Sequence, residues 1–301
     1  MKIYSTDQYV LPLPPGHTFP MAKYRLLRQR IEASGWPGVQ WCEPHAASDA
    51  ELARAHDLDY IRAASAGQLG DAAMRRIGFP WSEQLIERSR RSSGATLEAA
   101  FAALDDGYAV NLAGGTHHAF ADHGEGYCLF NDAVVAARAV QSAGRVRRVV
   151  VLDCDVHQGN GTAAICRLDP SIYTFSIHGA RNYPLRKERS DLDIELADGT
   201  GDLGYLDALE RGLTRALDES RADLAIYLAG ADPFAGDRLG RLALTKPGLA
   251  ERDRVVLEAC QRAGLPVVIV MAGGYAKQVS DTVDIHYQTV ALVARLASAV
   301  P

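Results

Sequence analysis

The sequence predicts an α/β fold in which helices cover both faces of a mainly parallel β-sheet. Short apolar runs alternate with helical patterns along the chain, and this alternation is typical of parallel sheets. No internal repeat, low-complexity linker or break in composition divides the 301 residues. Because α/β folds often exceed about 200 residues without splitting, we expect one domain, residues 1–301.

Five short runs that are rich in β-branched or aromatic residues predict buried strands. In chain order they are Tyr108–Ala113, Val149–Leu152, Ile172–Ile177, Leu224–Ala229 and Val267–Met271. The second run is apolar throughout, as expected for a strand that is covered on both faces.

Three segments between these runs predict helices. They are a helix that is capped by Asn131 and runs to Gln141, the amphipathic segment Tyr205–Glu219, and Ala250–Ala263. The last of these precedes Gly264 and Pro266, which together form a strong stop signal. Arg186–Asp202 is charged and contains glycine, so we expect a long surface loop there.

The composition is that of an ordinary globular protein. Hydrophobic residues make up 48% of the chain and charged residues 23%, and the net charge is −5. This charge argues against nucleic-acid binding and favours cationic partners such as lysine side chains or polyamines. No stretch approaches the roughly 18 apolar residues of a membrane span, so no membrane partner is expected.

Cysteine usage favours a reducing compartment, which we take to be the cytoplasm. The five cysteines are scattered and include no Cys-x-x-Cys pair, so neither a disulfide framework nor a cysteine-rich zinc site is expected. Residues Met1–Ser5 lack the apolar core of a signal peptide.

Polar and glycine-rich motifs follow the predicted strands where each strand ends. They are Gly114-Gly115-Thr116-His117-His118, Asp153–Gly161, His178, Gly230-Ala231-Asp232-Pro233 and Gly273-Gly274-Tyr275. In open parallel sheets, ligands bind outside the carboxyl ends of the strands. Chance gives one or two such coincidences, so five predict a catalytic site at this edge of the sheet.

The motif after the second strand predicts a metal centre. Side chains alternate along an extended segment, so Asp153, Asp155 and His157 are expected to point the same way. We predict that Asp155, His157 and Asp232 bind a zinc-type ion and leave a position for water and substrate. The competing interpretation is a polar loop that caps the next helix, with Asp232 as a turn residue before Pro233.

Two adjacent histidines are candidate acid and base groups. His117 and His118 can reach one pocket only from a loop, and histidine titrates in the range that proton transfer needs. Asp153 and Asn160 could orient the two imidazoles. Tyr275 could donate a hydrogen bond to a developing oxyanion. The competing interpretations are surface histidines and a tyrosine that only packs.

Taken together, these motifs resemble the zinc-dependent histone deacetylase family. The similarity runs from about His17 to about Ile285, and its motifs are Gly114–Ala119, Gly126–Asp132, Asp153–Gly161, Gly230–Asp232, Gly236–Gly240 and Gly273–Tyr275. The resemblance implies an arginase-like three-layer α/β/α fold and hydrolysis of an N-acylated amine.

The resemblance also implies individual roles. Asp155, His157 and Asp232 would hold zinc. His118 would act as general base and then acid, His117 would be its electrostatic partner, hydrogen-bonded to Asp153, and Tyr275 would bind the carbonyl and the oxyanion. Gly126, Tyr127 and Tyr183 match the substrate tunnel, and Asp153, Asp155, His157, Ser176 and Ile177 match a structural potassium site.

Two departures from the family motifs indicate which branch of the family the chain resembles. Many members carry Asp where this chain has Asn160, and a third glycine where it has Ala272. The chain looks most like the class IV branch and its bacterial relatives, a branch that includes members removing long acyl chains. The expected substrate is therefore an acyl-lysine of a protein, acetyl or longer, and an acetylated polyamine is the alternative.

Two other functions fit parts of the pattern. A binuclear manganese ureohydrolase similar to arginase needs a richer set of carboxylates than Gly159-Asn160-Gly161 and Asp232 provide. A non-catalytic acyl-lysine binding module would have lost a metal ligand, His118 or Tyr275, and all of these are present.

Overall fold

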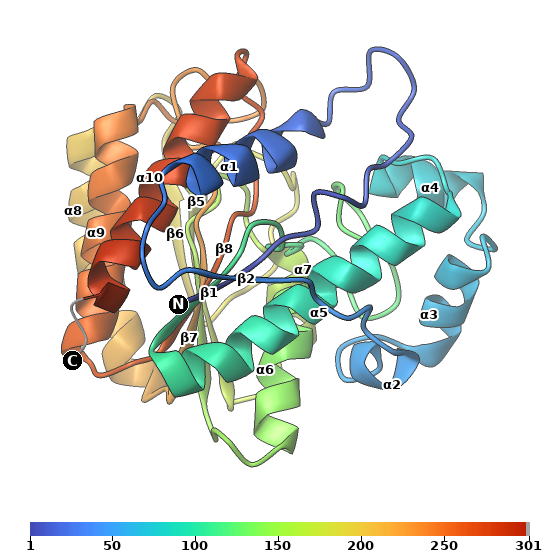
Figure 1. The fold of residues 1–301 in the computed structure, drawn as a ribbon, viewed down its shortest axis with the longest axis horizontal. Coiled ribbons are helices and arrows are strands. Elements are labelled where there is room, and N and C mark those ends of the chain that lie inside the picture. The colour runs from blue at the N-terminus through green and yellow to red at the C-terminus, as the bar shows by residue number, and fades with distance from the viewer. Residues whose placement is uncertain (299–301) are drawn as a thin grey trace.

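A computed structural model describes residues 1–298. One sheet of eight strands has the order β2-β1-β3-β8-β7-β4-β5-β6, and every neighbouring pair is parallel (Figure 1). The strands are β1 Lys2–Tyr4, β2 Gln40–Cys42, β3 Tyr108–Asn111, β4 Val149–Asp153, β5 Ile172–Gly179, β6 Leu192–Leu196, β7 Leu224–Leu228 and β8 Val267–Val270.

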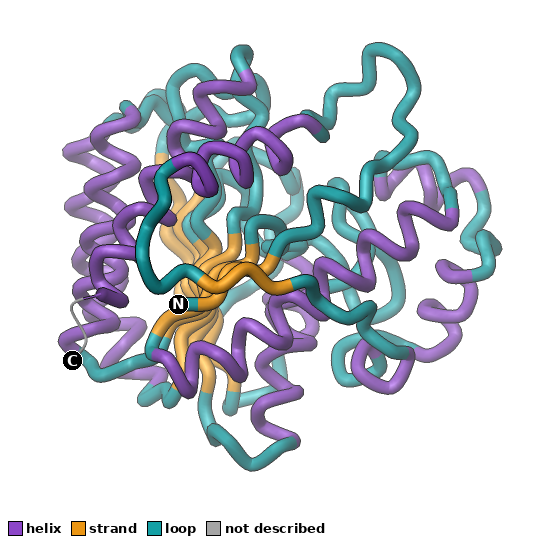
Figure 2. The backbone as a smooth tube through the Cα atoms, viewed as in Figure 1, coloured by secondary structure: helices purple, strands orange, loops and turns teal. Residues whose placement is uncertain are grey.

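Helices lie on both sides of the sheet, as Figure 2 shows. One layer contains α1 Ala22–Ala33, α8 Asp202–Ser220, α9 Lys246–Arg262 and α10 Val279–Ser298. The other contains α5 Glu83–Asp106, α6 Asp132–Ser142 and α7 Asn160–Cys166, with the short helices α2 Asp49–Leu52, α3 Leu58–Ser65 and α4 Asp71–Ile77 beyond α5. The expected three-layer α/β/α arrangement is confirmed.

Each face of the sheet has its own hydrophobic core. In β4, Val149 and Val151 pack in the core that includes α5 and α6, whereas Val150 and Leu152 pack in the core that includes α8 and α9. This is the period of two that a pleated strand imposes. Because both faces are covered, β4 is buried over its whole length.

The five predicted strands are present, with ends that differ by one or two residues. The predicted cap of α6 is also present, since the Asn131 side chain accepts a hydrogen bond from the Val134 amide at 3.2 Å. Helix α9 begins four residues before the predicted Ala250, because Thr245 caps it and Pro247 stands in its first turn.

The prediction of a continuous loop over Arg186–Asp202 is wrong. This segment contains β6, which pairs with β5 at the edge of the sheet. Its alternating residues Leu192, Ile194 and Leu196 are only half-buried, so an edge strand gives a weaker apolar signal than a central one. His178, which we expected just after a strand, lies within β5.

The sheet order explains how distant motifs meet. β3, β8, β7 and β4 are consecutive in the sheet although β3 and β4 are successive strands in the chain. The chain therefore crosses over two strands, and the loops that follow these four strands gather at one edge. No helix within residues 1–298 combines the length and apolarity needed to cross a membrane.

Candidate active site

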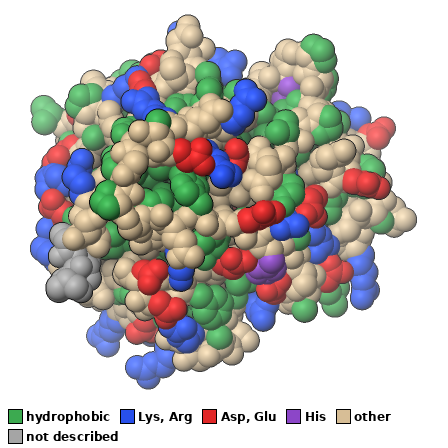
Figure 3. Space-filling view, viewed as in Figure 1, with side chains coloured by type: hydrophobic (Ala, Val, Ile, Leu, Met, Phe, Trp, Pro, Cys, Tyr) green, Lys and Arg blue, Asp and Glu red, His purple; other side chains and the backbone are tan. Residues whose placement is uncertain are grey.

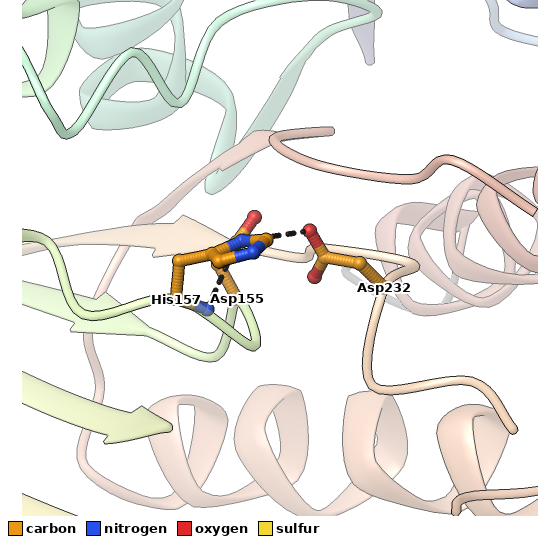
Figure 4. Close-up of side chains that lie close together, drawn as sticks. All are labelled: Asp155, His157 and Asp232. Carbon is orange, nitrogen blue, oxygen red and sulfur yellow. Dashed lines mark hydrogen bonds and ion pairs between the residues drawn. The ribbon is translucent and has the colours of Figure 1, made fainter. Parts of the chain in front are cut away.

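The three predicted metal ligands lie together at this edge. Asp155 and His157 follow β4, Asp232 follows the neighbouring β7, and one ligand atom from each lies within 4.8 Å of the others. Figure 4 shows the three side chains pointing toward one another, with His157 Nδ1 3.0 Å from Asp155 Oδ1 and 3.4 Å from Asp232 Oδ2. Asp232 Oδ2 is buried and accepts no hydrogen bond in the described chain. This free lone pair suits a cation.

Charge couples these ligands in the ion-free protein. Burial lowers the pKa of His157, but the adjacent carboxylates of Asp155 and Asp232 outweigh it and raise the value to about 10. Burial and the neighbouring Asp155 charge raise the pKa of Asp232 to about 7. Without an ion, the two carboxylates therefore favour the protonated imidazole of His157.

Asp153 is not part of the group of three ligand candidates, and the extended backbone on which the expectation of one common face rested ends at this residue. β4 ends at Asp153, and the alternation rule ends with it. Beyond this point the Asp155 amide donates to Asp153 Oδ1 at 3.1 Å and the His157 amide donates to Asp155 Oδ1 at 2.9 Å, so the chain turns. Asp153 instead lies 2.7 Å from His117 Nδ1 through Oδ2.

The two histidines sit in opposite electrostatic environments. Burial lowers the pKa of His117, but the charges of Asp153 and Asp155 outweigh it and raise the value to about 9. Burial and the positive charges of His117 and His157 hold the pKa of His118 well below its usual range. His118 Nδ1 lies 2.7 Å from Asn160 Oδ1. A neutral base beside a charged partner is the arrangement that proton abstraction needs.

Asp132 fixes the loop that carries these histidines. Its buried carboxylate accepts hydrogen bonds from the amides of Gly115 at 3.0 Å and Thr116 at 2.8 Å. Gly115 also has a positive φ, and a Cβ there would lie 2.5 Å from the Cβ of Ala272. The glycine is therefore required both for the turn and for the close approach of the β8 loop.

Tyr275 is held over the same cavity by the loop after β7. Its amide donates to Asp237 Oδ2 at 2.6 Å, and the Arg238 Nε donates to its carbonyl oxygen at 3.0 Å. Asp237 Oδ1 also accepts from the amide of Leu239 at 2.8 Å. Burial and the charge of Asp232 hold the pKa of the Tyr275 phenol above its usual range, so it remains a hydrogen-bond donor.

A cavity of about 560 Å³ contains all these groups. Its lining includes the metal-ligand candidates Asp155, His157 and Asp232, the groups His117, His118 and Tyr275, and the tunnel candidates Gly126, Tyr127 and Tyr183. The ring of Tyr183 stands perpendicular to His118 with centroids 5.0 Å apart, and the ring centroids of Tyr127 and Tyr275 are 5.8 Å apart. Asn160 and Asp153 stand behind the histidines, outside this lining.

Two residues of the cavity wall adopt a backbone that glycine favours. Tyr127 has φ +65° and Ala272 has φ +51°. Left-handed backbone costs a non-glycine residue about 1 to 3 kcal/mol and persists where the surroundings enforce it. At Ala272, this conformation gives a physical reason for a glycine at the equivalent position in relatives.

Two functional neighbours were missed from the sequence. Glu125 Oε1 lies 2.6 Å from the Asn160 side-chain nitrogen. Arg252, which is fully buried on α9, donates through Nη1 to the carbonyl oxygens of Cys154 and Gly230, beside the candidate ligands. Glu125 lies in a loop without any pattern, but a burial prediction for α9 could have singled out Arg252.

The potassium site stays a prediction. Asp153 and Ser176 are paired across β4 and β5, so the two segments that would form the site lie side by side. The Ser176 hydroxyl lies 2.9 Å from His178 Nδ1, and the intervening residue, Ile177, is buried.

Residues 17–290 match the family described as histone deacetylase domain. The chain belongs to the histone deacetylase family. This membership supports hydrolysis of the deacetylase type, and it confirms the family suggested by the motifs.

Three relatives illustrate the range of this histone deacetylase family. An uncharacterised protein of Picosynechococcus sp. is 45% identical, over 94% of this chain and 95% of its own length. Histone deacetylase 2 of Arabidopsis thaliana is 30% identical over 80% of this chain and 66% of its own length. Histone deacetylase-like amidohydrolase of Pseudomonas aeruginosa is 30% identical over 88% of this chain and 74% of its own length.

A solved structure shows the same fold. The crystal structure of the HDA15 HD domain matches with a TM-score of 0.80 over 97% of this chain and 90% of the other, at 21% identity. The arginase/deacetylase-like α/β fold expected from the motifs is therefore confirmed.

Proposed function

We propose that the protein is a zinc-dependent deacylase that hydrolyses the amide bond of an acylated lysine side chain in a protein. The observation that carries this proposal is the grouping of a buried Asp-His-Asp set with a neutral histidine and a buried tyrosine in one cavity. Family membership supports the reaction class, and the donor set supports the metal.

Asp155, His157 and Asp232 would hold the zinc ion. Two carboxylates and one imidazole suit zinc, and three protein ligands leave a position open for water and substrate. When bound, the ion would polarise the scissile carbonyl and lower the pKa of the attacking water.

The protein's own groups perform the proton transfers. His118 donates its Nδ1 hydrogen to Asn160, so its Nε2 is free to accept the proton of water and later to return it to the leaving lysine amine. Burial and the positive charges of His117 and His157 keep the pKa of His118 low, and Asp153 holds His117 in place through its Nδ1. The Tyr275 phenol donates to the carbonyl oxygen and is most effective when that oxygen carries charge in the tetrahedral transition state.

The tunnel candidates position the lysine stem. The aromatic walls of Tyr127 and Tyr183 would pack on its methylene groups, and Gly126 would leave room beside His118, where a Cβ would lie 2.6 Å from the imidazole. The length of the preferred acyl chain stays a prediction of the class IV resemblance. Lys23, a buried ammonium in the cavity wall, makes that wall partly polar.

A substrate panel tests the proposal. Zinc-loaded protein should release acetate or a longer acid from acyl-lysine peptides, and octanoyl- and myristoyl-lysine should be compared with acetyl-lysine on one peptide backbone below micelle-forming concentrations. No hydrolysis of any acyl-lysine by protein that contains stoichiometric zinc would overturn it. Urea release from a guanidino substrate would instead indicate a ureohydrolase.

A further inference from the structure

The mouth of the cavity carries an excess of positive charge. Four arginines belong to its lining, Arg75, Arg76, Arg181 and Arg241, and all four are exposed. The acidic side chains in the same lining are Asp155 and Asp232, which are buried and form part of the proposed metal centre. A substrate that approaches this cavity therefore meets guanidinium groups first.

One nearby carboxylate compensates part of this charge. Asp198 Oδ2 lies 3.6 Å from Arg181 Nη1 and 3.2 Å from Arg241 Nη1, so two arginines share one counterion. Arg75 and Arg76, in the last turn of α4, form no ion pair within the part of the chain that the structure describes. Positive charge thus remains uncompensated.

The other nearby carboxylate, that of Glu125, forms no ion pair with these arginines within residues 1–298. Glu125 is half-buried, lies outside the cavity lining and accepts a hydrogen bond from Asn160. The positive mouth also contrasts with the chain as a whole, whose net charge is −5. On the face drawn in Figure 3, basic and acidic side chains are interspersed. A mouth whose exposed charges are arginines is therefore a local feature.

We propose that the acyl-lysine substrate of this site is flanked by acidic residues. This inference rests on the proposed function and names its substrate class. An aspartate or glutamate one to three residues from the acylated lysine can reach Arg75 or Arg76 while the lysine stem enters the cavity. Guanidinium groups pair with carboxylates in a two-pronged geometry, so they suit this recognition. An acetylated polyamine, whose remaining amines are cationic, is repelled by the same groups.

Three peptides of equal length test the proposal. Each has one central acetyl-lysine, and the flanking positions are glutamate, glutamine or arginine. The glutamate peptide should have the highest kcat/KM and the arginine peptide the lowest, with roughly tenfold between them, because each exposed ion pair contributes only a few-fold. The difference should lie mainly in KM and shrink at about 1 M salt, where screening is strong.

Variants connect this preference to the mouth. The double variant Arg75→Glu with Arg76→Glu should reverse the ranking of the peptides while an uncharged, blocked acetyl-lysine is hydrolysed at the wild-type rate. The matched control, Arg147→Glu with Arg167→Glu, has the same net charge. Arg147 precedes β4 and Arg167 follows α7, both away from the cavity lining, so this control should keep the original ranking.

A binding measurement gives a second readout. Fluorescence anisotropy of the labelled glutamate peptide with metal-free protein should show binding that weakens with salt and is lost in the Arg75/Arg76 variant. If the double variant does not fold, Arg75→Gln and Arg76→Gln serve singly. Equal kcat/KM for the three peptides, or faster turnover of acetylspermidine, overturns the proposal. Failure to hydrolyse a blocked lysine that carries an acetyl, octanoyl or myristoyl group would instead refute the proposed function.

Discussion

The carboxylate of Glu125 fixes the orientation of the Asn160 side chain, with Oε1 2.6 Å from the amide nitrogen. An ionised carboxylate only accepts hydrogen bonds, so the amide must turn its NH2 group toward Glu125 and its oxygen toward His118. That oxygen lies 2.7 Å from His118 Nδ1. The Nδ1 atom must then carry the hydrogen, and Nε2 is left as the proton acceptor.

Asn160→Asp should move the acid limb of the kcat/KM profile to higher pH. A carboxylate stabilises the His118 imidazolium and raises its pKa, and the base works only when neutral. The rise should be incomplete, because the introduced carboxylate would face Glu125 and two adjacent carboxylates share a proton. A pH–rate series checks this, and a limb that stays in place or moves lower would show that the side chain at position 160 does not act on the base.

Glu125→Gln should lower kcat by about tenfold or more, the usual cost of losing an outer orienting group, with little change in KM. Glutamine can donate as well as accept, so the Asn160 amide is free to turn. The acid limb should move to lower pH, because a negative charge that favours imidazolium is lost.

The double variant Asn160→Asp with Glu125→Gln is the control for this pair. The introduced glutamine amide can donate to the introduced carboxylate, so the acid limb should lie above that of either single variant. If Glu125→Gln keeps the wild-type turnover and pH profile, Glu125 has no part in orienting His118.

Asp155→Ala or Asp232→Ala should abolish nearly all activity and leave less than one metal ion per chain. Each change removes one of the three metal ligands. The loss of metal affinity and activity should therefore exceed the roughly 10- to 100-fold that is typical when a residue around the ligands is changed. Elemental analysis and activity measure this, with Asp207→Ala on the exposed surface of α8 as the control. Two tightly bound ions in the wild type, or full activity of either variant, would contradict the assignment.

Tyr275→Phe should preserve the fold and the metal content but reduce kcat about 100- to 1000-fold. The phenol acts on charge that develops in the transition state. Losing one such hydrogen-bond donor typically reduces kcat by this factor. Tyr127→Phe is the matched control, because the Tyr127 hydroxyl contacts Thr18 at 2.7 Å, at the outer wall. Near-wild-type turnover of Tyr275→Phe would indicate that Tyr275 contributes packing alone, because phenylalanine keeps the aromatic ring.

Zinc binding should release protons, and its affinity should rise with pH. The metal needs neutral His157 and ionised Asp232, whose pKa values in the ion-free protein are raised to about 10 and about 7. Between these values binding displaces about one proton, so affinity should rise roughly tenfold per pH unit. Below pH 7, Asp232 is also protonated in the ion-free protein, so zinc binding should displace up to two protons.

Calorimetry in buffers of different ionisation enthalpy counts the released protons. Zinc affinity that is constant between the pKa values of Asp232, about 7, and His157, about 10, would show that His157 is not protonated between the two carboxylates.

The central sheet was predictable from sequence, but its edges were not. β4 is buried on both faces and reads as a continuous apolar run. β1 and β2 have three residues each, which is too short for an alternation of apolar and polar side chains to be recognised in the sequence. The site motifs were found because they follow central strands that are buried and apolar. Glu125, by contrast, is an ordinary loop acid until the fold brings it to Asn160.

Hydrogen bonds from Arg252 hold the backbone on both sides of the proposed metal centre. The guanidinium reaches from α9 to the carbonyl groups of Cys154 and Gly230, so the turns that carry Asp155 and Asp232 take their shape from the polypeptide alone. We therefore expect the fold to form before any ion is bound. A cell that is short of zinc would store complete, inactive molecules, and a rise in zinc would activate them as quickly as the ion can enter, with no new synthesis.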